Sequence, residues 1–138
     1  MKRVLIILPL CLASLQAGAF SPQVQGYIQE LKAEVKKTDP SFSDFSIERG
    51  KEVFTSVHVG KKGEKISCTS CHNANLRDKG ENVHTAKMIE PLSPSANPAR
   101  LTKLKDVQKW LRRNFNDVYN NDGTALQRGD VLYYINAN

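Results

Sequence analysis

The feature that most constrains this chain is the segment Cys68–His72, which has the spacing C-x-x-C-H. This spacing is the attachment site of a c-type haem. Two thiols can bond the two vinyl groups on one edge of a porphyrin, while the adjacent imidazole reaches the iron. We therefore predict one covalent haem c with its iron, attached through Cys68 and Cys71 and ligated on the proximal side by His72.

Three other interpretations of the paired cysteines are weaker. A zinc site needs four ligands, and only His58 and His84 are left to complete it, without a second paired motif. A redox C-x-x-C belongs in a thioredoxin-like βαβ context, which this sequence does not predict. A disulfide between Cys68 and Cys71 would be strained and leaves His72 without a role.

Residues 1–19 have the organisation of a secretory signal peptide. Lys2 and Arg3 form a positive start, a short apolar stretch follows, and residues 17–19 are small, as at a cleavage site. The apolar stretch is too short to span a bilayer. It contains Cys11, which lacks the preceding small residues of a lipidated cysteine, so we expect Cys11 to be removed. The sequence therefore predicts an exported, periplasmic protein, with an uncleaved membrane anchor as the alternative.

The predicted mature chain, residues 20–138, is long enough for one domain with a modest core. We expect a monohaem cytochrome c domain over this range, with residues 20–44 as an N-terminal helical extension. The chain holds 20 Lys and Arg against 14 Asp and Glu, for a formal net charge of +6. It has no basic-aromatic array of the kind that binds nucleic acid. The basic charge indicates an ordinary solvated surface or steering toward an acidic redox partner.

Hydrophobic spacing predicts an all-α fold, and no segment has a convincing strand pattern. The first helix should start after Ser21 and end by Pro40, because Ser favours a helix start and Pro a helix stop. The second should cover residues 47–57, and a short one residues 68–73. In the second helix, Gly50 should permit close packing of another helix. The packed side of that helix is expected to contain Ile47, Gly50, Val53, Phe54 and Val57.

The second half of the chain should begin irregularly and end in two helices. Three prolines exclude a long helix in residues 74–103, a segment that can follow the edge of a haem. Residues 102–118 should form one helix, and Thr124 with Gln127 should cap the last. Asn114 interrupts the apolar stripe of residues 102–118 and needs a partner, which could be backbone, buried water or iron. The stripe itself contains Leu104, Val107, Trp110, Leu111, Phe115 and Val118.

Ordinary electron-carrying cytochromes c use methionine as the second axial ligand. Apart from Met1, the only methionine is Met88, which is 16 residues after His72. This spacing is short for a segment that has to pass around the porphyrin rim and reach the iron from the other side. His84 is a competing ligand, although a lone loop histidine is more often at the surface, as we expect for His58. A low-spin electron shuttle with Met88 or His84 as sixth ligand is therefore one open alternative.

Four segments carry a further resemblance, namely residues 49–54, 67–72, 89–98 and 109–114. The runs Pro-Leu-Ser-Pro and Trp-Leu-Arg-Arg-Asn in the last two are far more specific than C-x-x-C-H alone. Together these segments resemble the Sphaeroides haem protein (SHP) family of oxygen-binding monohaem cytochromes c. The resemblance implies the class I cytochrome c fold. It also implies that Asn114, which matches the asparagine of that family, is the second axial ligand of the ferric haem.

The resemblance also implies a function. An amide oxygen is a hard, weak donor that suits ferric better than ferrous iron. Reduction should therefore release Asn114 and open a site for oxygen, nitric oxide or carbon monoxide. Electron transfer would accompany this binding, and the family suggests a dihaem cytochrome c and a membrane cytochrome b as redox partners. An enzyme that reduces peroxide or nitric oxide is a third class, but no distal acid–base pair supports it.

Overall fold

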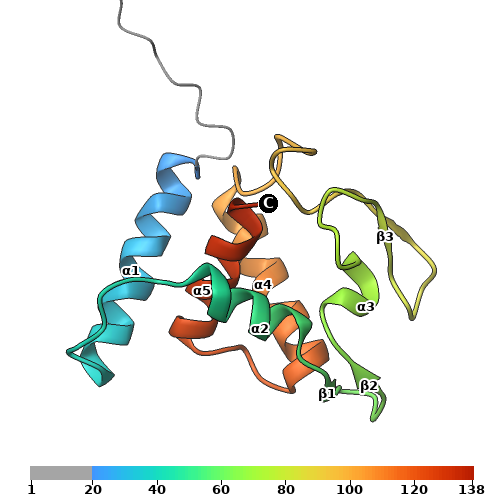
Figure 1. Ribbon diagram of the computed structural model, residues 1–138, viewed down its shortest axis with the longest axis horizontal. Coiled ribbons are helices and arrows are strands. Elements are labelled where there is room, and N and C mark those ends of the chain that lie inside the picture. The colour runs from blue at the N-terminus through green and yellow to red at the C-terminus, as the bar shows by residue number, and fades with distance from the viewer. Residues whose placement is uncertain (1–19) are drawn as a thin grey trace, which may run out of the picture.

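The computed structural model describes residues 20–138, so the predicted signal peptide and Cys11 lie outside the described residues. Within that range, five helices and two short antiparallel strand pairs follow one another along the chain (Figure 1). The helices are α1 (Pro22–Thr38), α2 (Ile47–Thr55), α3 (Thr69–His72), α4 (Leu104–Tyr119) and α5 (Ala125–Asn136). The strands are β1 (His58–Val59), β2 (Lys65–Ile66), β3 (Gly80–Glu81) and β4 (Met88–Ile89). The predicted all-α class is confirmed.

Helix α1 forms where the sequence predicts it and covers one side of the core. The hydroxyl of Ser21 accepts a hydrogen bond from the amide of Val24 at 3.3 Å. Pro22 occupies the first helical position, where a missing N–H has no consequence. The buried face packs against α5, beside which α1 runs in Figure 1. That face consists of Val24, Tyr27, Ile28, Leu31 and Val35.

Helices α2 and α5 cross in direct contact at Gly50. A Cβ at this position would overlap the carbonyl oxygen of Asp130 and would lie 2.8 Å from the Cβ of Tyr134. The predicted role of Gly50 in close helix packing is therefore confirmed. The close approach brings the ring of Phe54 to 5.5 Å from that of Tyr134, between centroids.

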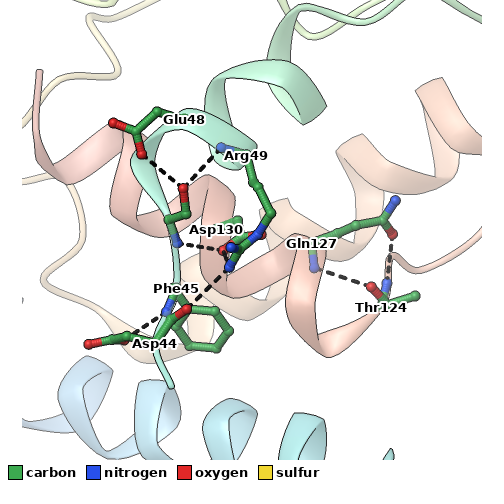
Figure 2. Close-up of polar contacts among 8 residues, drawn as sticks. Asp44, Phe45, Glu48, Arg49, Thr124, Gln127 and Asp130 are labelled. Carbon is green, nitrogen blue, oxygen red and sulfur yellow. Dashed lines mark hydrogen bonds and ion pairs between the residues drawn. The ribbon is translucent and has the colours of Figure 1, made fainter. Parts of the chain in front are cut away.

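An ion pair between a buried carboxylate and a partly exposed arginine joins the same two helices (Figure 2). Asp130 on α5 is 2% exposed, and its carboxylate accepts hydrogen bonds from Nε and Nη2 of Arg49 at 2.8 and 2.9 Å. The backbone amide of Ser46 donates a third bond to Asp130 at 2.7 Å. A buried carboxylate destabilises a fold unless it is paired and hydrogen-bonded, and here three donors satisfy it. The pair therefore holds the start of α2 on α5.

The observed elements differ from the predicted ones between α2 and α4. Helix α2 ends at Thr55, and both Ile47 (44% exposed) and Val57 (62% exposed) lie outside the core. The chain leaves the helix there because β1 pairs with β2, with His58 opposite Ile66. Strands β3 and β4 form a second ladder within the segment predicted to be irregular. The sequence does not predict these ladders, because two-residue strands are too short for a hydrophobic alternation.

The C-terminal helices follow the predicted turn and capping pattern. Asn120 and Gly123 have positive φ angles of 57° and 72° in the turn after α4. Thr124 and Gln127 form a reciprocal capping box at the start of α5. Within residues 20–138, none of the helices combines the length and the apolar character needed to cross a membrane.

The crossing at Gly50 yields a stability prediction. Gly50→Ala should lower the free energy of unfolding by about 1–3 kcal/mol, because the new methyl group meets backbone that cannot move aside freely. Gly26→Ala in α1 is the matched control, since a Cβ there meets nothing within 4 Å. The control should leave stability unchanged or raise it, as Ala favours a helix over Gly. Urea unfolding followed by circular dichroism measures both, and equal midpoints for the two variants would contradict the crossing.

Candidate functional site

The predicted haem-attachment residues lie on one turn of helix. Cys68 is the N-cap of α3, and Cys71 and His72 lie within that helix. The amide of His72 donates to the carbonyl of Cys68 at 3.0 Å, so the turn brings the ends of the motif together. Gly80 of β3 packs directly on this turn, because a Cβ there would overlap the carbonyl oxygen of Cys71. Neither cysteine is in a disulfide.

Two adjoining cavities lie between α3, α4 and the segment that connects them. Their volumes are about 570 Å³ and 160 Å³. Cavities of roughly 300–1,000 Å³ are typical of small-molecule and cofactor sites. Six residues line both cavities, so we treat the two as one site. These residues are Cys68, His72, Leu92, Arg100, Trp110 and Asn114.

Both parts of the site combine apolar walls with polar groups. The smaller part is walled by apolar side chains of α2, α4 and α5, and it is also lined by Arg100, Lys103 and Asp106; the apolar ones are Phe54, Val107, Leu111, Phe115, Val131, Leu132 and Ile135. The larger part is bounded by the β3–β4 hairpin and α4, with polar groups such as Asn82, His84 and Asp117. Apolar walls with charged groups among them suit a flat apolar group that has one polar edge, as a haem does.

The electrostatics of the motif suit metal ligation by His72. Burial lowers the pKa of His72 to about 4, and the positive charge of Arg100 adds to this shift. The imidazole is therefore neutral at pH 7, which is the form that binds a metal. Its ring lies 6.0 Å from that of Phe54, between centroids, against the wall of the smaller cavity.

The alternative chemistries of the cysteines find no support. Burial raises the pKa of the Cys68 thiol to about 12, with the nearby Cys71 adding to the shift. Redox-active C-x-x-C cysteines have lowered pKa values instead. Within residues 20–138 there is also no group of three His, Cys, Asp or Glu side chains that could hold a metal, so His58 and His84 complete no zinc site.

Arg100 supplies a half-buried positive charge to the site. Its Nε donates to the carbonyl of Pro91 at 2.9 Å and its Nη2 to the carbonyl of Glu90 at 2.7 Å. The side chain of Glu90 pairs with Lys79 instead, at 3.1 Å. Burial lowers the pKa of Arg100, which means that the charge is partly desolvated. A desolvated cation bonded to neutral carbonyls favours an anion beside it, and the carboxylates of a haem fit this requirement.

The structure separates the three candidates for the sixth iron ligand. Asn114 lines both cavities together with His72. Met88 lines only the larger part and is 63% exposed. His84 also lines only the larger part, and its Nε2 lies 3.1 Å from Oε1 of Glu64.

The orientation of α4 explains the place of Asn114. Its core-facing residues are Val107, Leu111, Phe115 and Val118, as predicted. Trp110, which the periodicity placed in the same stripe, is 45% exposed and faces the cavities instead. Asn114 is one turn further along, so both side chains are directed to the site. Among the described residues no hydrogen bond reaches the Asn114 carboxamide, whereas Asn116 bonds Asp122 at 3.1 Å.

Sequence reasoning missed or misplaced several residues near the site. His58, expected at the surface, is half-buried, with its ring 4.0 Å from that of Tyr119 and its Nε2 3.0 Å from the Ser56 hydroxyl. The roles of Glu64 and Arg100 depend on contacts between distant segments, for which the sequence contains no local signal. Each lies within a polar stretch that looks like an ordinary solvated loop.

Comparison with known proteins places this arrangement among cytochromes. The family model for a domain of unknown function, DUF1924, matches residues 40–135. The cytochrome c-type protein SHP of Cereibacter sphaeroides is 42% identical over 90 residues, which are 65% of this chain and 69% of that protein. Cytochrome c'' of Methylophilus methylotrophus is 29% identical over 97 residues, 70% of this chain and 67% of that protein. The structure of oxidized SHP, an oxygen-binding cytochrome c, matches with a TM-score of 0.74 and 33% identity, over 87% of this chain and 100% of that chain.

Proposed function

The chain belongs to the DUF1924 family of SHP-type c-type cytochromes, and we propose that it couples electron transfer to the binding of a small diatomic molecule. The predicted class I cytochrome c fold and the haem c cofactor are confirmed by this membership. The identity of the sixth ligand and the binding of oxygen or nitric oxide are the parts that we propose. The SHP whose structure matches is described as binding oxygen.

We assign the residues of the C-x-x-C-H turn to holding the haem. When bound, the haem would supply an iron that changes oxidation state and binds small ligands. Cys68 and Cys71 would attach the porphyrin, and the neutral imidazole of His72 would ligate the iron. Arg100 provides the positive charge that a haem carboxylate needs when it is partly buried.

The observation that carries the proposal is the Asn114 carboxamide, which lines the cavities with His72 and has no hydrogen-bond partner among the described residues. Its oxygen is a hard, neutral donor that favours ferric over ferrous iron. Because buried Leu111 and Phe115 fix α4 in the core, a movement of Asn114 away from an iron would involve its side chain rather than the helix. Withdrawal on reduction would open a position for a diatomic ligand, and the amide N–H would remain near it as a donor.

The proposal also covers the cellular location of the protein and its redox partners. A periplasmic location follows from the predicted signal peptide at residues 1–19. A dihaem cytochrome c or a membrane cytochrome b is the proposed redox partner. Without Lys2 and Arg3 of the signal peptide, residues 20–138 hold 18 Lys and Arg against 14 Asp and Glu, and this formal charge of +4 would speed encounter with an acidic surface on such a partner.

Covalent attachment of the haem is the first functional prediction. After denaturation in acidic organic solvent, the haem should stay with the protein, because thioether bonds to Cys68 and Cys71 survive that treatment. Replacement of either cysteine with Ala should reduce the yield of stable holoprotein, since the haem fills much of the site. Mass spectrometry of the denatured protein reads out the adduct, and complete extraction of the colour would refute the attachment.

Ligation by Asn114 gives the second prediction. Asn114→Ala should keep the haem attached but change the ferric absorption spectrum, because water or no ligand replaces the amide oxygen. Asn116→Ala is the matched control, as this neighbouring amide on α4 bonds Asp122 instead. Met88→Ala should likewise leave the ferric spectrum unchanged, since Met88 is exposed. A spectrum altered by Met88→Ala and not by Asn114→Ala would identify the protein as a methionine-ligated electron shuttle.

The exported form gives the third prediction. Intact-mass measurement of protein purified from the periplasm should show an N-terminus at Phe20 or within a residue or two of it. Retention of Met1, or an acylated Cys11, would contradict a cleaved signal peptide.

A further inference from the structure

The loop at the tip of the β3–β4 hairpin presents His84 in a fixed position. The side-chain carbonyl of Asn82 accepts hydrogen bonds from the amides of His84 and Thr85 at 2.9 and 3.0 Å. The amide of Asn82 bonds the carbonyl of Lys87 at 2.9 Å across the base of the loop. His84 is therefore held by local bonds and does not depend on a contact with the iron.

The partner of His84 is a carboxylate on the other hairpin. Nε2 of His84 lies 3.1 Å from Oε1 of Glu64, in the turn between β1 and β2. Both Glu64 oxygens are buried, and neither forms a hydrogen bond with another described residue. A buried carboxylate without a donor is unfavourable. The Glu64 side chain as a whole is 31% exposed, and Nε2 of His84 is a nitrogen within ion-pair distance of its carboxylate.

Of this pair, His84 lines the larger part of the haem cavity and Glu64 lines neither part. His84 lines the larger part of the cavity together with Asn114. The hairpin that carries Glu64 is anchored to α4, where the amide of Lys61 bonds the carbonyl of Asp117 at 2.9 Å. The Glu64–His84 contact therefore connects the β3–β4 hairpin to the β1–β2 hairpin, which is itself bonded to α4.

We infer that Glu64 and protonated His84 form a clasp that holds the β3–β4 hairpin over the haem cavity and slows the access of small ligands to it. The part concerning ligands rests on the proposed function, whereas the closure of the hairpin does not.

The clasp should depend on pH. Histidine side chains in general are charged at pH 5.5 and neutral at pH 8, whereas carboxylates are charged at both values. We therefore expect the clasp to be closed at pH 5.5 and open at pH 8. Lysine, arginine and carboxylate side chains ordinarily do not titrate in this interval. His72 is the proposed iron ligand of the holoprotein, so it is held in the neutral, metal-binding form. The other charged groups that line this cavity are Lys87, Glu90, Arg100, Arg113 and Asp117.

Hydrogen exchange of the ferric holoprotein tests the closure directly. At pH 5.5, amides of residues 82–89 should exchange about fivefold faster in Glu64→Gln and in His84→Gln than in wild type, the size expected for a partly exposed ion pair. At pH 8 the three proteins should agree. The amide exchange rates are compared only between proteins at the same pH, because intrinsic exchange rates change with pH. Equal exchange in all three at pH 5.5 would overturn the clasp.

Glu90→Gln provides the matched control on the same hairpin. It removes the Lys79–Glu90 pair, which also has a separation of 3.1 Å but is about 60% exposed at both ends. This variant should match wild type at both pH values. An increase in exchange as large as that of Glu64→Gln would mean that any lost charge loosens the hairpin, and the clasp would be refuted.

Carbon monoxide association with the reduced protein tests the effect on ligands. Glu64→Gln and His84→Gln should bind it about fivefold faster than wild type at pH 5.5 and equally fast at pH 8. If exchange follows the expected pattern but no protein binds carbon monoxide, the hairpin clasp stands and the proposed function fails. If wild type and both variants bind carbon monoxide at the same rate and also show the same hydrogen exchange, the proposed function stands and the clasp fails.

Discussion

The crossing of α2 and α5 at Gly50 is the contact on which the rest of the structure depends. The missing side chain lets the two backbones touch, and the Arg49–Asp130 pair holds them there. Phe54, one turn beyond Gly50, is thereby fixed between Tyr134 and the ring of His72. The apolar wall of the smaller cavity is made largely by these helices and by α4. The haem site is thus an extension of the helical core.

Helix α4 gives this site its chemistry. One face of the helix is buried in the core, and the adjacent face directs Trp110 and Asn114 into the cavities. Methionine or a second histidine at such a position would stay on the iron in both oxidation states and give a simple electron carrier. An amide is a weaker and harder donor, so with Asn114 as the proposed ligand the same scaffold would exchange its ligand when the iron is reduced. The redox state would then control whether a small molecule can bind.

Local features of the sequence predicted much of this structure. Capping residues such as Ser21 and Thr124 act within one turn, and C-x-x-C-H acts within five residues, so each can be recognised without knowledge of the fold. The Arg49–Asp130 bonds, by contrast, join residues 81 apart and depend on how two helices cross. Periodicity also placed Trp110 in the core, because hydrophobic spacing does not distinguish packing against protein from packing against a cofactor.

The most direct test of the central claim is one optical spectrum of the purified wild-type protein, recorded oxidised, then reduced, then reduced under carbon monoxide. With Asn114 as a ligand of ferric iron only, the reduced spectrum should be high-spin and five-coordinate, and carbon monoxide should shift it at once without denaturant. A sharp low-spin reduced spectrum that carbon monoxide leaves unchanged would show that a strong sixth ligand stays on the iron, and would contradict the account.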